Sequence, residues 1–141
     1  MSIRSKVITT IIFLAMVINL FSLTVYAYNT TYYVDTLNGS DSNNGTTTST
    51  AWKTLSKVNS TVFGPGDKIL FKSGHTWYGT LQPQGSGASN NYITVGSYGD
   101  GNKPIINGNG SRSAVRLNNL HYWTIENLKI VNPASTAAKR N

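Results

Sequence analysis

The chain has 141 residues, carries 12 basic against 5 acidic residues for a formal net charge of +7, and contains no cysteine. This length fits one small domain or part of a larger one, and the lack of cysteine excludes disulfide bonds as a source of its stability. The basic residues are scattered, without the runs and interleaved aromatics of a nucleic-acid groove, so we expect no nucleic-acid partner.

The first 27 residues have the pattern of a secretory signal peptide. A basic start (Arg4 and Lys6) is followed by an apolar middle and by the exit Val25-Tyr26-Ala27. The alternative is an uncleaved membrane anchor, but Asn19 interrupts the apolar run and no basic stop-transfer cluster follows. We therefore expect residues 1–27 to be removed, leaving a secreted, extracellular protein without stable membrane insertion.

The mature chain is predicted to open with a strand and an ordered loop. Residues 31–35 (TYYVD) are aromatic or β-branched for the most part, which favours a strand. Residues 37–48 (LNGSDSNNGTTT) are rich in Asn, Gly and Ser, which supply turns. The stretch 41–45 (DSNNG) weakly resembles the start of a calcium loop, but the distant bidentate Glu is missing, so Asx turns are the preferred interpretation.

One helix is predicted next. Residues 49–50 (ST) offer an N-cap, and Trp52, Leu55 and Val58 recur at a three-residue spacing. We expect a helix of two or three turns whose apolar face covers neighbouring structure. The tight turn at 63–67 (FGPGD) ends it.

From Lys68 onward the sequence predicts only strands and loops. A Gly/Ser/Asn-rich loop at 84–91 separates two groups of short strands. The predicted strands are 68–72, 75–81, 92–98, 104–107, 114–118, 122–127 and 128–132.

Apolar and polar residues alternate along the last three of these strands, which predicts one buried and one exposed face for each. The predicted buried positions are Val115, Leu117, Trp123, Ile125, Leu128 and Ile130. Arg116, Glu126 and Lys129 fall on the exposed faces and are our candidates for lining a groove that binds a sugar chain. The simpler alternative is an ordinary solvated face.

Asparagines such as Asn118, Asn127 and Asn132 stand at the strand ends, and asparagine tolerates the left-handed backbone of a sharp bend. Short strands with Asn bends and no intervening helices are typical of a solenoid, and Val95 and Val115 lie about one coil apart. A single spacing does not establish a repeat. On the pattern alone, a β-sandwich built from hairpins remains the alternative.

Residues able to do chemistry are sparse. The five acidic residues show no close pair of the kind that glycoside hydrolysis uses, and the two histidines stand apart, so we expect no metal site. Trp77, Tyr78 and Tyr98 offer rings for stacking on sugars, although packing in the core is the preferred role for aromatics within strands.

Seven short segments follow one another along the chain: YYVD (32–35), NGSDSNNGT (38–46), AWKTL (51–55), PGDKI (65–69), YITVGSYG (92–99), KPIING (103–108) and WTIENL (123–128). In this order they resemble the N-terminal region of secreted bacterial right-handed parallel β-helix proteins of the pectate-lyase-like superfamily. The resemblance covers most of the mature chain.

This resemblance implies a mainly β fold. Residues 28–91 would form an N-terminal cap, a strand plus a short helix, together with entry strands, and residues 92–141 would start a right-handed parallel β-helix that is truncated at its C-terminus. Family members run to several hundred residues, and a solenoid needs about three repeats for stability. We therefore expect this sequence to be an N-terminal fragment.

The resemblance also implies action on polysaccharide, expected to be acidic and uronate-containing, by calcium-assisted β-elimination or by hydrolysis with paired carboxylates. No active-site motif of the family falls on any position of this chain, so the catalytic residues are unknown, and we expect the fragment itself to be inactive. We expect no cofactor within it, with calcium left open for the full-length parent. The alternative is a non-catalytic adhesin or a carbohydrate-binding structural module.

Overall fold

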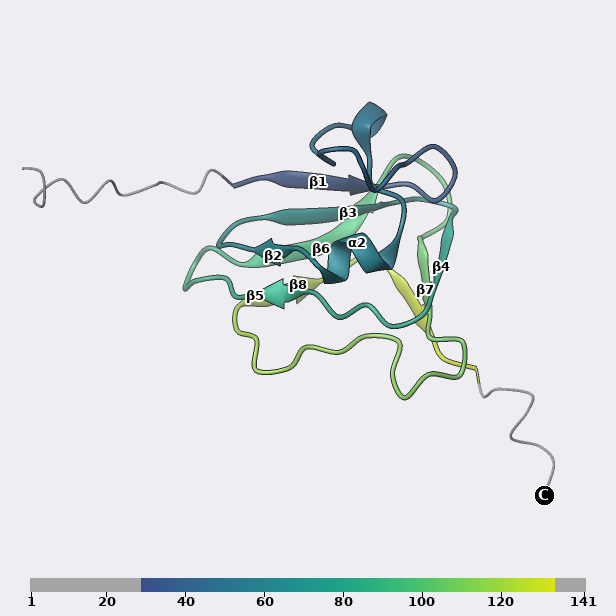
Figure 1. Cartoon of the computed structure of the whole chain (residues 1–141). Helices are drawn as coiled ribbons and strands as arrows, with labels where there is room; N and C mark the ends of the chain where they lie inside the picture. The colour runs from purple at the N-terminus through teal and green to yellow at the C-terminus, as the bar shows by residue number, and fades with distance from the viewer. Residues whose placement is uncertain (1–28, 134–141) are drawn as a thin grey trace, which may run out of the picture.

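The structure is a computed structural model that describes residues 29–133 (Figure 1). The expected signal peptide at 1–27 and the C-terminal residues 134–141 lie outside the described residues. Within the described range, no helix has the length and apolar character needed to cross a membrane.

The described part of the chain begins with a strand, a loop and two short helical segments. Strand β1 (Thr31–Val34) leads into the polar loop, which contains the 3₁₀ helix η1 (Thr48–Thr50). Helix α2 (Leu55–Asn59) and strand β2 (Val62–Phe63) follow. The aromatic and β-branched residues of β1 suit a pleated, half-buried strand, whereas the Asn, Gly and Ser residues after it suit turns.

The rest of the described chain consists of short strands joined by turns and loops. These strands are β3 (Lys68–Lys72), β4 (Thr76–Tyr78), β5 (Gln84–Gly85), β6 (Ile93–Tyr98), β7 (Ile105–Asn107), β8 (Trp123–Ile125) and β9 (Lys129–Val131).

The strands form three sheets with the orders β1-β3-β6-β8, β4-β7-β9 and β2-β5. Every strand ladder in the described part of the chain is parallel. Parallel strands require crossover connections, and here each crossover passes through at least one other sheet before the chain returns one layer further along (Figure 1). The fold is therefore mainly β and β-helix-like. The alternative of a sandwich built from antiparallel hairpins is excluded for these strands.

The register between layers aligns apolar side chains into columns. Tyr32 pairs with Ile69, Ile69 with Val95, and Val95 with Ile125. Ile69 and Val95 have no exposed surface, while their neighbour Lys68 is exposed, because successive side chains of a strand point to opposite faces. Each layer thus covers the apolar interior of the layer before it.

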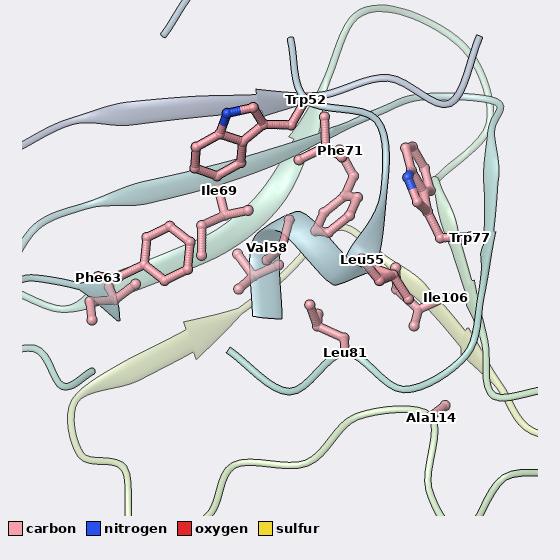
Figure 2. Close-up of a cluster of buried hydrophobic side chains, with 13 residues drawn as sticks. Trp52, Leu55, Val58, Phe63, Ile69, Phe71, Trp77, Leu81, Ile106 and Ala114 are labelled. Atoms are coloured by element: carbon pink, nitrogen blue, oxygen red, sulfur yellow. The ribbon is translucent and has the colours of Figure 1, made fainter. Parts of the chain in front are cut away.

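One hydrophobic core joins the sheets to helix α2. Figure 2 shows Leu55 and Val58 of α2 pointing into the cluster that contains Phe71 and Leu81. The rings of Phe71 and Trp77, from the two larger sheets, meet edge to face with centroids 4.8 Å apart. The helix therefore contributes its apolar face to the same interior that the strands enclose.

The helix is shorter than predicted. Thr54, not residue 49 or 50, is its N-cap, and the Thr54 side chain accepts a hydrogen bond from the backbone N–H of Lys57. Trp52 was predicted on the helix face, but it is extended and forms a parallel bridge with Val34. Its indole stacks on Tyr32 at 4.6 Å, a contact made from the extended bridge rather than from a helix.

The predicted strand at 114–118 is also wrong. Only Val115 pairs there, in an isolated parallel bridge with Leu81, and Leu117, which was predicted to be buried, is exposed. The left-handed backbone of Asn119 breaks the extended conformation soon afterwards. Val95 and Val115 are consequently not equivalent positions, because Val95 pairs with Ile125.

The layered core predicts a large effect for Phe71→Ala. The Phe71 side chain is fully buried, so its truncation removes apolar contacts and leaves a cavity, and we expect the free energy of unfolding to fall by about 4 kcal/mol. Urea denaturation followed by circular dichroism measures this change. Leu37→Ala is the control, because Leu37 is 72% exposed; equal effects of the two substitutions would contradict the described core.

Candidate functional site

All three candidate residues from the sequence are exposed, as the alternation predicted. Glu126 follows β8, where its backbone N–H donates to the carbonyl of Val95 and its side chain lies beside Gly96. Lys129 begins β9 and pairs with Ile105. Their proposed role in binding a sugar chain stays a prediction.

The three candidates do not form one site. Arg116 lies on the segment that bridges to Leu81, Glu126 adjoins the four-stranded sheet, and Lys129 belongs to the three-stranded sheet. Among residues 29–133, no ion pair or side-chain hydrogen bond joins any two of them. The bend at Asn127, which has a left-handed backbone, turns the chain between Glu126 and Lys129.

Lys129 lines an open groove of about 610 Å³, which we name the lysine groove. Its lining combines two ammonium groups, one amide and apolar side chains, contributed by Asn102, Lys103, Ile105, Leu128 and Lys129. Such a lining can bind hydroxyl groups or an anion against an apolar floor, but none of these five described residues carries a carboxyl group for acid or base catalysis. Sequence reasoning missed Asn102 and Lys103, because a polar loop between strands carries no periodic signal.

A second, shallower hollow of about 240 Å³ lies beside α2 and β4. It is lined by Thr36, Lys53, Thr54, Leu55, Thr76, Trp77 and Tyr78. Trp77 belongs to the core, and its indole N–H donates to the carbonyl of Lys53 at 3.0 Å. This packing confirms the preferred interpretation for Trp77.

Three of the five acidic side chains hold the backbone in place. Asp35 accepts hydrogen bonds from the backbone N–H groups of Leu37 and Asn38, which forms an Asx turn. Asp67 accepts from the backbone N–H groups of Thr30 and Gly64. These carboxylates therefore brace turns and are committed to structural contacts.

Within 41–45 the expected Asx turn is made by Asn44, whose side chain accepts a hydrogen bond from the backbone N–H of Thr46, and not by Asp41. Asp41 instead accepts hydrogen bonds from the backbone N–H groups of Lys53 and Thr54 and from the Thr54 hydroxyl at 2.6 Å. It thereby ties the polar loop to the start of α2, and Thr54 in turn caps that helix.

Asp41 and Asp35 have lowered pKa values in spite of their partial burial. Burial acts to raise the pKa of Asp41, but the hydrogen bonds from Thr54 and Lys53 outweigh it and hold that pKa below its usual value. Asp35 behaves likewise: hydrogen bonds from Asn38 and Leu37 overcome the effect of burial and lower its pKa.

A polar cluster lies where β1, β3 and β6 end. The Nδ1 atom of His75 is 3.3 Å from a carboxylate oxygen of Asp35 and 3.2 Å from the hydroxyl of Thr36. Burial, followed by the charge of Asp35 and the neighbouring Tyr33, raises the pKa of Tyr98 to about 12. Thr36 of this cluster also lines the hollow beside α2 and β4, whereas His75 and Tyr98 line neither that hollow nor the lysine groove.

No metal-binding constellation is found in the part of the chain that the structure describes: no three His, Cys, Asp or Glu side chains converge there. The two acidic residues outside the structural contacts, Asp100 and Glu126, are exposed. The geometry of the described residues therefore supports ligand binding better than bond cleavage.

Comparison with known proteins places the chain beside carbohydrate-active enzymes. It is 30% identical to a lacto-N-biosidase of Bifidobacterium longum subsp. longum, over 77% of this chain and 9% of that protein. The crystal structure of a GH136 lacto-N-biosidase from Eubacterium ramulus matches with a TM-score of 0.72 and 29% identity, covering 79% of this chain and 22% of that one. The native crystal form of the same protein gives a TM-score of 0.71. No family model matches.

These relatives correct the resemblance drawn from the sequence. They support a β-helix-like fold and a connection to carbohydrate, but they are lacto-N-biosidases and not pectate lyases. Action on an acidic, uronate-containing polymer consequently has no support. The chain spans less than a quarter of the length of either relative, so the activity of a whole protein does not transfer directly.

The Asp41 contacts predict a pH-dependent effect of Asp41→Asn. An amide accepts fewer of these hydrogen bonds and carries no charge, so we expect the free energy of unfolding at pH 7 to fall by about 2 kcal/mol. A carboxyl whose pKa is lowered by folding stabilises the protein above its unfolded pKa and loses this contribution as pH falls through its folded pKa. The difference between variant and wild type should therefore shrink below about pH 4.

Urea denaturation at pH 7 and at pH 3 measures this difference. Asp100→Asn is the control, because Asp100 is exposed, and it should leave the stability nearly unchanged at both values. A penalty for Asp41→Asn that is the same at pH 7 and pH 3 would show that the charged hydrogen bonds are not its cause.

Proposed function

We propose that this chain is the N-terminal part of an extracellular β-helix protein that acts on neutral oligosaccharides. The supporting observation is the match to lacto-N-biosidases, at 29% identity and a TM-score of 0.72 over 79% of this chain. In this proposal the described coils begin a right-handed helix and bind sugar, while bond cleavage belongs to another part of the protein.

The two ends of the stack of layers differ in how well their apolar side chains are covered. At the β1 edge, Trp52 pairs with Val34 and α2 fills the interior, which is the arrangement that a cap over residues 28–91 requires. At the opposite edge, Ile130 pairs with the fully buried Ile106 but is itself 47% exposed. We propose that a further coil covers Ile130, with residues 92–141 as the start of the helix.

In this proposal the described residues bind sugar, and another part of the protein cleaves it. Glycoside hydrolysis requires two carboxyl groups facing each other across the scissile bond. Asp35, Asp41 and Asp67 are committed to backbone N–H groups, whereas Lys103 and Lys129 line a groove able to hydrogen-bond sugar hydroxyls. Binding without turnover is therefore the function that these residues support.

The test is a titration of the purified chain with a neutral tetrasaccharide that ends in lacto-N-biose and with a tetragalacturonate, followed by NMR. We expect the neutral sugar to shift resonances of the lysine groove without release of any product. Lys103→Ala with Lys129→Ala should weaken this binding about tenfold, equivalent to about 1.4 kcal/mol.

Arg112→Ala is the control, because it removes one positive charge at an exposed position outside the groove. It should leave the affinity for the neutral sugar unchanged. Binding of the tetragalacturonate alone, or formation of unsaturated uronate products, would contradict the proposed function.

A further inference from the structure

Two exposed tyrosines form an aromatic ledge, defined here as Tyr92 and Tyr122. Their rings meet edge to face, with centroids 5.6 Å apart and planes at 90°, and the side chains are 47% and 45% exposed. Each tyrosine directly precedes a strand, and the residues that follow them, Ile93 and Trp123, are paired in register. The ledge thus spans two successive layers at one corner of the fold.

The backbone at Tyr122 is unusual for a bulky residue. Five residues other than glycine have a positive φ in the described part of the chain: Asn90, Asn109, Asn119, Asn127 and Tyr122. Four of them are asparagine, which tolerates this conformation, whereas Tyr122 has φ 59°. A left-handed backbone is strained for a bulky L-residue, so the aromatic ring at position 122 is kept at the expense of stability.

The surrounding backbone holds this strained residue in place. The carbonyl of Tyr122 accepts a hydrogen bond from Ile93, and the carbonyl of His121 accepts one from Gly87. A Cβ at Gly87 would lie 2.5 Å from the Tyr122 carbonyl oxygen, so only glycine fits at this approach. The ring is therefore presented on an ordered support, which lowers the entropy lost when a ligand binds.

A further coil of the protein would not cover Tyr92. Additional coils stack beyond the edge strand β8, whereas Tyr92 precedes β6, which is already flanked by β3 and β8. Tyr92 nevertheless remains about half exposed. A ligand can therefore reach the Tyr92 ring from the side of the stack.

We propose that the aromatic ledge is a stacking subsite for a neutral pyranose ring of an oligosaccharide, which deepens the proposed function and rests on it. A pyranose offers an apolar C–H face to aromatic rings and hydroxyl groups around its rim. Thr94 and Thr124 pair in register on the outward face beside the ledge and can hydrogen-bond such hydroxyls. None of these four side chains is charged, which matches a neutral sugar.

The test is the variant Tyr122→Asn, because the other described non-glycine residues with a left-handed backbone are all asparagine. In Tyr122→Asn the ring is lost while the backbone conformation is tolerated, so we expect an unchanged or higher unfolding temperature and at least about tenfold weaker binding of the neutral tetrasaccharide. Tyr92→Ser should weaken binding similarly. The matched control Tyr122→Phe retains the ring and should retain the affinity.

The outcomes separate the subsite from the function on which it rests. If the wild type binds the tetrasaccharide and Tyr122→Asn binds it equally well, the ledge is not a subsite and the proposed function stands. If the wild type binds no neutral sugar, the proposed function fails together with the subsite. A Tyr122→Asn variant that unfolds at a clearly lower temperature would show that the ring serves folding, which also overturns the inference.

Discussion

The structure depends on parallel pairing in register between successive layers of the chain. Tyr32, Ile69, Val95 and Ile125 form one inward column because each strand meets the next without a shift. A slip of one residue would turn every apolar side chain of a strand outward. The short strands cannot bury their apolar faces singly, so each layer is stable only with its neighbours.

Much of this arrangement is predictable from the sequence. Strands β3, β6 and β7 coincide closely with apolar or alternating runs, and the bend at Asn127 occurs where an asparagine ends a strand. In contrast, β5 lies in a segment predicted as loop. It pairs with β2 through Gly85, where a Cβ would lie 2.0 Å from the carbonyl oxygen of Phe63. Such a two-residue ladder forms because two segments that are distant in the sequence approach each other, and local residue propensities do not predict this approach.

The candidate site, like the fold, is predictable from the sequence only in part. Alternation predicts that Arg116, Glu126 and Lys129 are exposed, and they are, but Leu117 and Ile130, which the same alternation predicts to be buried, are exposed as well. Whether exposed residues gather depends on the angle of each bend, and here the bends place the three residues apart. The lysine groove combines loop residues with residues of β7 and β9, and the aromatic ledge combines two corner residues; in both, the neighbours are set by layer stacking and not by sequence spacing. The resemblance identified the fold class better than the substrate, because many activities share one architecture.

The central claim is tested most directly by disulfide formation between layers, since the chain has no cysteine of its own. Lys68 pairs with Thr94 and both lie on the outward face, so the double variant K68C/T94C should form a disulfide readily under mild oxidation. K72C/T94C joins residues four positions out of register, about 13 Å apart along the strand, and should remain reduced. Efficient disulfide formation in K72C/T94C but not in K68C/T94C would indicate antiparallel pairing and would contradict the layered account.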